Sequence, residues 1–392
     1  MQYRKNKEGQ DVSVLGFGCM RFTRKNGQID QEKAERELEK ALEMGVNYFD
    51  TAYVYPGSEV CLGKFVASHG CREKINIATK LPQYRVKKTG DLEKFFSEEL
   101  ERLQTDYVDY YLMHMLNDVK SWQRLCDLGI REWIEGKKKE GKIRRIGFSF
   151  HGGTEQFKAL IDAYDWDFCQ MQFNYMDEHA QAGIDGLRYA NAKGLPVIIM
   201  EPLRGGRLVN ALPKDAQAAI EKKEPKRSAA DWGLRWVWNH PEVTVVLSGM
   251  NDIAQVVENC RIASEALPGH LTEEDMALYD DILKAIHGKT MVGCTGCGYC
   301  QPCPRGVNIP TCFANYNASY ADSYMSGFRE YFMCTTLRKD RSNASLCIEC
   351  GKCEKVCPQG IEIRKELKNV VKRFETPIYK IAAWGAPLIM KY

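Results

Sequence analysis

The sequence from Asp30 to Asp50, DQEKAERELEKALEMGVNYFD, places an amphipathic helix directly before a short β-strand. Apolar residues recur at helical spacing through its first part, and Gly45 is a typical residue for ending a helix. The run VNYFD that follows carries the β-branched and aromatic residues that are enriched in strands. Similar alternation extends on both sides of this stretch and predicts a fold built from strand–helix units.

Eight runs are predicted as strands, at residues 14–19, 46–50, 75–80, 108–114, 143–149, 167–173, 196–201 and 243–249. Helical patterns lie between them, at residues 30–45, 92–103, 122–140, 154–163, 181–193, 228–239 and 252–263. Eight such units match the size of a (β/α)8 barrel. A doubly wound open sheet is the alternative, but LGFGCMR after the first strand lacks the third glycine of a dinucleotide fingerprint. The predicted fold class is therefore α/β, with a TIM barrel.

The composition is that of a globular protein, with 392 residues, 44% hydrophobic and 27% charged. A formal net charge of +3 gives no electrostatic reason to expect nucleic acid or an anionic membrane as a partner. No apolar run approaches the roughly 20 residues that span a bilayer. The amino terminus has no apolar core of the kind found in secretory signals. We therefore expect a cytoplasmic protein.

Sixteen cysteines are distributed unevenly, with six scattered through residues 1–289 and ten in residues 290–392. Scattered cysteines in a cytosolic chain behave as small buried apolar residues. Eight of the others form two runs with metal-ligand spacing. These are Cys294, Cys297, Cys300 and Cys303 in the first run, and Cys347, Cys350, Cys353 and Cys357 in the second. Cys312 and Cys334 fall outside this spacing, and we expect them to be buried thiols.

The second run resembles the bacterial ferredoxin motif, and the first is one residue short in its last gap. Zinc held by C-x-x-C pairs is the alternative, but two runs that each end in Cys-Pro favour two [4Fe–4S] clusters. The resemblance implies crossed ligation, in which Cys357 joins the first three cysteines of the first run and Cys303 joins the first three of the second. The other pairing gives each run its own cluster.

These patterns predict three parts of the chain. A barrel covers residues 1–287, a two-cluster domain covers residues 288–376, and an apolar tail covers residues 377–392. Residues 304–346, between the cysteine runs, lack strand alternation and indicate a mainly helical ferredoxin-like domain. The tail is too short to span a membrane, so we expect it to pack on the protein, and anchoring on a membrane surface is the alternative.

Polar residues follow three neighbouring strands of the predicted barrel: Asp50 and Tyr55, Lys80, and His114. Catalytic groups of such barrels lie at the carboxyl ends of the strands. The surrounding sequences, GVNYFDTAYVYPGSE, IATK and YLMH, resemble the signatures of the aldo-keto reductase family. The resemblance implies reduction of an aldehyde or ketone by an NAD(P)H-dependent enzyme.

In this family Tyr55 would donate a proton to the carbonyl oxygen. Lys80 would favour the tyrosinate and lower the tyrosine pKa, while Asp50 would hold Lys80 in place. His114 would orient the carbonyl group. A small carbonyl compound is therefore the expected substrate.

The resemblance also implies cofactor contacts, at Ser149, Gln170, Met200, Leu203, Ser248, Gly249, Asn251, Glu258 and Asn259. Two of the family's positions are changed, because Phe150 replaces an asparagine and Met200 replaces an aromatic residue. No Lys or Arg occurs in residues 248–256, so the choice between NADPH and NADH stays open, with Arg204 or Arg207 as substitutes. The changes also leave room for a flavin.

A hydride carries two electrons whereas a [4Fe–4S] cluster passes one, so three functions compete. The first is a carbonyl reductase whose clusters are structural or regulatory, and it is the one we favour. The second is an electron-transfer enzyme whose clusters exchange electrons with a barrel-bound flavin or substrate, with a ferredoxin or another redox protein as partner. The third is a redox sensor with an idle barrel, and the complete catalytic tetrad counts against it.

Overall fold

The computed structural model describes residues 1–288, 290–294, 296, 298–321, 323–336, 341–357 and 359–389. It divides into two compact units. The first contains residues 1–209 and 227–274, and the second contains residues 210–226 and 275–392. Helix α9 (Lys214–Lys222) and most of α12 (Glu273–His287) thus belong to the same unit as the cysteine runs, although the sequence pattern placed the division at residue 287.

The first unit is a closed barrel of eight parallel strands, which confirms the predicted fold class. Neighbouring strands follow the order β10-β11-β12-β3-β6-β7-β8-β9. Their bounds are β3 (Leu15–Gly18), β6 (Tyr48–Asp50), β7 (Asn76–Leu81), β8 (Val108–Met113), β9 (Ile143–Phe150), β10 (Phe168–Gln172), β11 (Val197–Met200) and β12 (Val243–Ser248). Each overlaps one of the eight predicted runs, because strands buried on both faces are nearly continuous apolar segments.

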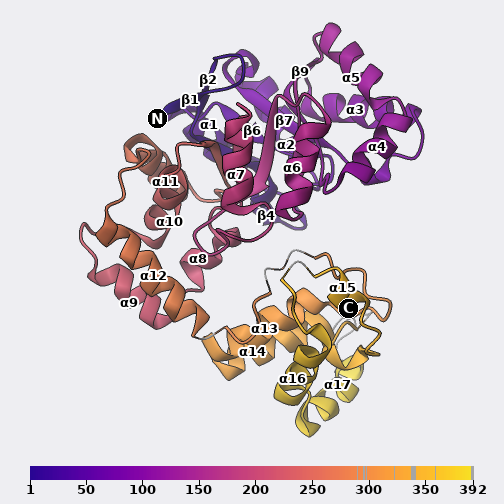
Figure 1. The fold of residues 1–392 in the computed structure, drawn as a ribbon, viewed down its shortest axis with the longest axis vertical. Coiled ribbons are helices and arrows are strands. Elements are labelled where there is room, and N and C mark those ends of the chain that lie inside the picture. Colours follow the sequence, from indigo (N-terminus) through magenta and orange to yellow (C-terminus); the bar gives the residue numbers. More distant parts are fainter. Residues whose placement is uncertain are drawn as a thin grey trace. The chain divides into compact units, whose positions relative to one another are not determined.

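Helices surround this barrel, as Figure 1 shows. They are α1 (Gln31–Glu43), α2 (Ser58–His69), α3 (Gly90–Leu103), α4 (Val119–Asp127), α5 (Ile130–Lys139), α6 (Thr154–Ala163), α7 (Gly183–Ala192), α8 (Arg207–Asn210), α10 (Ala229–Trp238) and α11 (Ile253–Glu265). The helix predicted over residues 122–140 is divided into α4 and α5, because Gly129 between them has φ of +80°. Two antiparallel hairpins are formed by β1 (Tyr3–Lys5) with β2 (Asp11–Ser13), and by β4 (Arg24–Lys25) with β5 (Gln28–Ile29).

The interior of the barrel is a packed core rather than a channel. Aromatic residues fill its centre, where the rings of Tyr48 and Tyr110 lie 4.9 Å apart and those of Tyr110 and Phe168 lie 5.0 Å apart. Leu112, Ile198 and other buried apolar residues pack around them. This core closes the barrel below the carboxyl ends of the strands, so polar side chains at those ends line its mouth.

The described regular elements of the second unit are helical, which agrees with the mainly helical domain predicted there. Besides α9 and α12 they are α13 (Ile309–Ala321), α14 (Tyr324–Tyr331), a π-helical turn (Phe332–Thr336), α15 (Lys352–Lys355), α16 (Ile363–Phe374) and α17 (Pro377–Ile389). Over the residues that the structure describes, no helix combines the length and the hydrophobicity needed to cross a bilayer.

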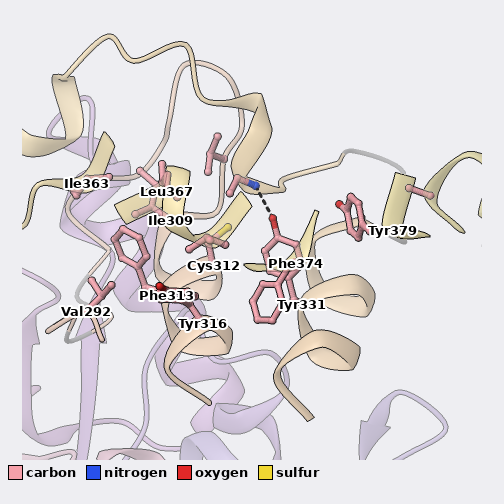
Figure 2. Packing of buried hydrophobic residues seen from close by; sticks show 14 residues of the cluster. Val292, Ile309, Cys312, Phe313, Tyr316, Tyr331, Ile363, Leu367, Phe374 and Tyr379 are labelled. Carbon is pink, nitrogen blue, oxygen red and sulfur yellow. Dashed lines mark hydrogen bonds between the residues drawn. The ribbon is translucent and has the colours of Figure 1, made fainter. Parts of the chain in front are cut away.

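A hydrophobic core packs α13, α14, α16 and α17 together (Figure 2). Tyr331 stacks on Phe374 with 4.7 Å between ring centroids, and its hydroxyl donates to Glu375 Oε1 at 2.6 Å and accepts from the Ala344 N–H at 2.9 Å. From the predicted tail, Tyr379 is also buried in this core. The loop that leads into the second cysteine run is thereby fixed to α14 and α16.

Candidate active site and cysteine-lined cavities

Asp50 and Lys80 form a buried ion pair at the mouth of the barrel. Asp50 is the last residue of β6, and Lys80 lies near the end of the adjacent strand β7. The Lys80 ammonium donates to Asp50 Oδ1 at 2.6 Å and to the Thr51 carbonyl at 2.7 Å. Burial alone would lower the pKa of Lys80, but Asp50 and Tyr55 outweigh it and the pKa is raised. Lys80 is therefore a fixed cation across the physiological pH range.

Tyr55, in the loop after β6, lies beside this cation. Its ring centroid is 5.1 Å from Lys80 Nζ and 6.0 Å from the ring of His114, which is nearly perpendicular to it at 87°. Lys80 and His114 therefore both lie next to the Tyr55 phenol. Asp50 joins this group through its hydrogen bond with Lys80.

The pKa of Tyr55 is raised, contrary to the direction expected from the sequence. Burial raises the pKa most, Lys80 lowers it and Asp50 raises it further. The Lys80 effect has the predicted sign, but it is smaller than the cost of placing a tyrosinate in a buried site. Tyr55 is therefore a protonated phenol at neutral pH.

His114, directly after β8, is 7% exposed. Burial, together with the charge of Lys80 and with His151, lowers the pKa of His114 to about 3. Its buried Nδ1 has no hydrogen-bond partner among the described residues. The imidazole is thus neutral at physiological pH, and it can donate a hydrogen bond without carrying a charge.

His151 is a second histidine at this mouth, and the sequence analysis did not single it out. Its side chain is hydrogen-bonded to Gln181, and it is close enough to His114 to affect the pKa of that residue. Its position is the signal that could have found it, because His151 directly follows β9, two residues after Ser149, at the carboxyl end of a barrel strand. Phe150 contacts Phe157 of α6, with 4.9 Å between ring centroids.

The predicted cofactor contacts on β9 and β10, Ser149 and Gln170, are hydrogen-bonded within the protein. Gln170, on β10, donates from Nε2 to Asp50 Oδ2 at 3.0 Å and is nearly fully buried. Ser149 Oγ accepts the Met115 N–H at 2.9 Å. Gln170 therefore belongs to the Lys80–Asp50 network across the barrel, while Ser149 supports the loop after β8.

The remaining predicted contacts lie near the ends of β11 and β12. Met200 ends β11 and packs on the barrel core, and Leu203 is half-buried in the loop after it. Ser248 accepts from Asn259 Nδ2 at 3.1 Å, and Glu258 accepts from the Ser228 hydroxyl at 2.6 Å. Gly249 and Asn251 are exposed before α11, and the Asn251 N–H donates to Gln255 Oε1 at 3.2 Å.

Arg21 is a cation beside the ends of β11 and β12, and the sequence analysis also missed it. A Cβ at Gly249 would lie 3.1 Å from Arg21 Cδ, and a Cβ at Gly205 would lie 2.6 Å from Arg21 Nη2. The exposed Arg21 side chain thus crosses two glycines that follow β12 and β11. Barrel closure explains the position, because β3, which precedes Arg21, pairs with β12.

The cysteine runs contribute to two cavities in the second unit. Cys294, Cys300 and Cys357 line the first cavity, together with apolar residues that include Phe313 and Ile361. Cys303, Cys347, Cys350 and Cys353 line the second, a cavity of about 350 Å³ that Cys300 also reaches. Cys297 lies outside the described residues. Each cavity thus receives cysteines from both runs.

Cys312 and Cys334 are separate from these cavities. Cys312 is buried in the core of the unit, with its thiol 3.8 Å from the Ser342 carbonyl. Cys334 is half-buried and lies 3.8 Å from a carboxylate oxygen of Glu330. Neither lines a cavity with the other cysteines.

Residues 14–284 match the Aldo/keto reductase family, and residues 293–362 match the 4Fe-4S dicluster domain. L-galactose dehydrogenase from Arabidopsis thaliana is 27% identical over 302 residues, covering 72% of this chain and 94% of that protein. The holo form of an aldo-keto reductase from Bacillus halodurans is 28% identical with a TM-score of 0.60, over 73% of this chain and 97% of that one. An aldo-keto reductase from Klebsiella pneumoniae in complex with NADPH is 25% identical, with a TM-score of 0.59. The match covers 72% of this chain and 95% of that one.

Proposed function

The chain belongs to the aldo/keto reductase family of oxidoreductases, and we propose that it reduces the carbonyl group of a small aldehyde or ketone with a hydride from NAD(P)H. The observation that supports this most directly is the position of Tyr55 beside the buried Lys80–Asp50 pair and His114. A tetrad that is complete in the sequence and convergent in space makes an idle barrel a poor alternative.

In this proposal Tyr55 donates its proton to the carbonyl oxygen. Its raised pKa keeps the phenol protonated before the reaction, and the adjacent Lys80 cation stabilises the tyrosinate that remains afterwards. Neutral His114 donates a hydrogen bond to the same oxygen and orients the substrate. Asp50 acts through Lys80 and is a positioning residue.

The nicotinamide cofactor, when bound, supplies the hydride. We propose that the cofactor would bind at the edge formed by Arg21, Gly205 and Gly249. An exposed guanidinium beside two glycines suits a phosphate group, because the phosphate can approach the backbone closely there. Ser248 and Asn259 line the same strand end. Arg21 supplies the cation that residues 248–256 lack, and this favours a phosphate-rich cofactor such as NADPH, which the Klebsiella pneumoniae relative binds.

The two cavities of the second unit fit two [4Fe–4S] clusters in their donor chemistry, since thiols and apolar side chains dominate their linings. We propose crossed ligation, with Cys294, Cys297 and Cys300 joined by Cys357. Cys303 then completes the set of Cys347, Cys350 and Cys353. The mixed lining of each cavity supports this pairing over one in which each run holds its own cluster.

An electron-transfer enzyme is the second candidate function. Cys350 at the second cavity is exposed, Gln170 is hydrogen-bonded to Asp50, and Phe150 packs on Phe157 where the family has an asparagine. In this alternative the clusters exchange electrons with a flavin or a substrate in the barrel.

An anaerobic titration separates the two functions. The full-length protein with its clusters is mixed with NADPH, then with a simple aldehyde, while the nicotinamide and cluster absorbances are followed. Oxidation of NADPH by the aldehyde with unchanged clusters supports the carbonyl reductase. Bleaching of the clusters by NADPH alone supports electron transfer, and no reaction with either reagent contradicts both.

A further inference from the structure

The second cavity, which Cys303, Cys347, Cys350 and Cys353 line, is open to solvent on one side. Cys350 is an exposed residue, and two apolar residues in the same lining, Ile348 and Val356, are 59% and 51% exposed. Lys352 is exposed in this lining as well. We call Ile348, Cys350, Lys352 and Val356 the cavity face. Exposed branched apolar side chains that gather at one place on a surface are typical of a contact surface.

The acidic side chains along this segment are neutralised within the protein. Glu349 pairs with Lys368 at 2.8 Å, Glu354 with Arg364 at 2.7 Å, and Glu362 with Lys365 at 2.6 Å. These three are the acidic residues between Cys347 and α16. The carboxylates of this segment therefore leave no unpaired negative charge.

Three cations near the face are left without a carboxylate partner in the described part of the chain. Lys352 and Lys355 belong to α15, beside Cys353, and Arg305 follows Cys303 by two residues. All three are exposed. The cavity face is thus apolar at its centre and positively charged around it, the arrangement of a transient interface with a charged rim.

We propose that this face docks an acidic one-electron carrier protein with a flavin or an iron–sulfur centre near its surface. Positive charge at the rim attracts such a carrier and speeds its encounter. A second copy of this chain suits the face poorly, because it would set Lys352 and Lys355 against the same cations.

In each encounter one electron leaves the reduced carrier and enters the iron–sulfur cluster that the cavity is proposed to hold. The carrier is oxidised by one electron, the cluster is reduced by one, and neither a bond nor a proton is transferred. This inference rests on the proposed cluster assignment.

The test uses the full-length protein prepared anaerobically, with an acidic flavodoxin as the probe and basic cytochrome c as the matched probe of opposite charge. Binding is measured by calorimetry at low and high salt. We expect the flavodoxin to bind, its affinity to fall with salt, and the cytochrome to bind at least about tenfold more weakly.

The variant K352E/K355E should weaken flavodoxin binding about tenfold or more, while K372E/K380E, with the same change of net charge at exposed lysines outside both cavity linings, should change it less than about twofold. Iron content is measured for each variant. Carbodiimide cross-linking of the wild-type protein should join Lys352 or Lys355 to carboxylates of the flavodoxin, which needs no variant.

Equal affinity for both probes, cross-links only to a second copy or to this chain's own carboxylates, or equal weakening by both double variants would overturn the inference. A wild-type protein without iron would overturn the cluster assignment instead. Clusters that are intact in a protein that binds no flavodoxin would leave that assignment standing and remove only the docking face.

Discussion

Lys80 is a buried cation that serves two neighbours. Its ammonium group bonds to Asp50 and to the Thr51 carbonyl, so it is held in one position. The Tyr55 ring lies beside it and experiences a charge that favours the tyrosinate, although burial keeps the phenol protonated at neutral pH. Individual side chains at this mouth therefore have defined protonation states, and those states can be tested one at a time.

Replacing Tyr55 with phenylalanine should lower kcat/KM for aldehyde reduction by about 10²- to 10⁴-fold, because the proton donor is lost while the ring remains. The dissociation constant for NADPH, measured by fluorescence titration, should change less than about twofold. Tyr53→Phe is the matched control, since Tyr53 lies in the same loop and its hydroxyl donates to Glu98 at 2.6 Å rather than to the catalytic site. An unchanged kcat/KM in the Tyr55 variant would remove this residue from the mechanism.

His114 should make the barrel sensitive to acid. Its folded-state pKa of about 3 is below the ordinary value of 6.5, so the unfolded chain binds the extra proton first and stability is lost as pH falls from 6.5 toward 3. Between pH 7 and pH 5 the loss is about 2 kcal/mol.

The measurement is urea unfolding of wild type and His114→Gln at pH 8, 7 and 5. The variant should lack about 2 kcal/mol of the acid-induced loss between pH 7 and pH 5, and both proteins should be insensitive to this imidazole between pH 8 and pH 7. The same loss of stability in both proteins would show that His114 is not the group responsible.

Among the elements, α1 contains a side chain that its packing does not satisfy. Glu37 is fully buried, neither of its carboxylate oxygens has a hydrogen-bond partner in the described structure, and Lys33 is 3.9 Å away. Burial raises the pKa of Glu37 to about 7, Lys33 lowers it, and Asp252 raises it. The helix therefore carries a carboxyl group that folding keeps protonated beyond its ordinary range.

Glu37→Gln should stabilise the protein at alkaline but not at acidic pH. Because the pKa of Glu37 is raised in the folded state, its protonated carboxyl makes its full contribution to stability below pH 4.5. That stability is lost as the pH rises to about 7. At pH 8 the variant should be more stable by about 3 kcal/mol, and at pH 4.5 the difference should fall below about 0.5 kcal/mol. Thermal unfolding at both pH values checks this, with exposed Glu39→Gln on the same helix as the control. Equal effects of the two substitutions at pH 8 would refute it.

Element by element, the strands could be predicted and several helices could not. Buried parallel strands are short apolar runs, and these stand out in one sequence. Helix α2 has no such signal, because Cys61, Leu62, Phe65 and Val66 are buried on more than one side. Gly63 would normally argue against a helix, but a Cβ there would lie 2.3 Å from the Arg102 carbonyl oxygen, so the contact between α2 and α3 requires it.

The candidate site shows the same division. Tyr55, Lys80 and their partners lie in signatures of contiguous sequence, so the resemblance located them. Arg21 and His151 depend on which strands become neighbours when the barrel closes, and that information is absent from local sequence. The net direction of the Tyr55 pKa could not be predicted either, because it depends on burial as well as on Lys80.

In the whole molecule a reductase barrel and a dicluster domain are joined in one chain. The two compact units each have a buried core, and the relatives described above match about three quarters of this chain or less. The proposed catalytic tetrad and the cysteine cavities belong to different units. Loss of a cluster ligand should therefore affect metal content without unfolding the barrel.

Full-length protein purified anaerobically should contain roughly eight irons per chain and no stoichiometric zinc. Cys350→Ala should lower this to roughly four, because one cluster loses a ligand. Cys334→Ala, outside both cavities, should leave it unchanged. Elemental analysis and visible absorbance provide the measurement, and zinc in place of iron, or equal iron in both variants, would contradict the assignment.

The mixed lining of the cavities has a consequence for biosynthesis. A nascent chain emerging from the ribosome exposes Cys294 and its neighbours before Cys347 to Cys357 have been translated. Since each cavity takes thiols from both runs, the proposed crossed ligation means that neither cluster could be completed on a partial chain. With crossed ligation, maturation of the two centres would be coupled, and it would follow the packing of α13 and α14 between the two runs rather than the order of translation.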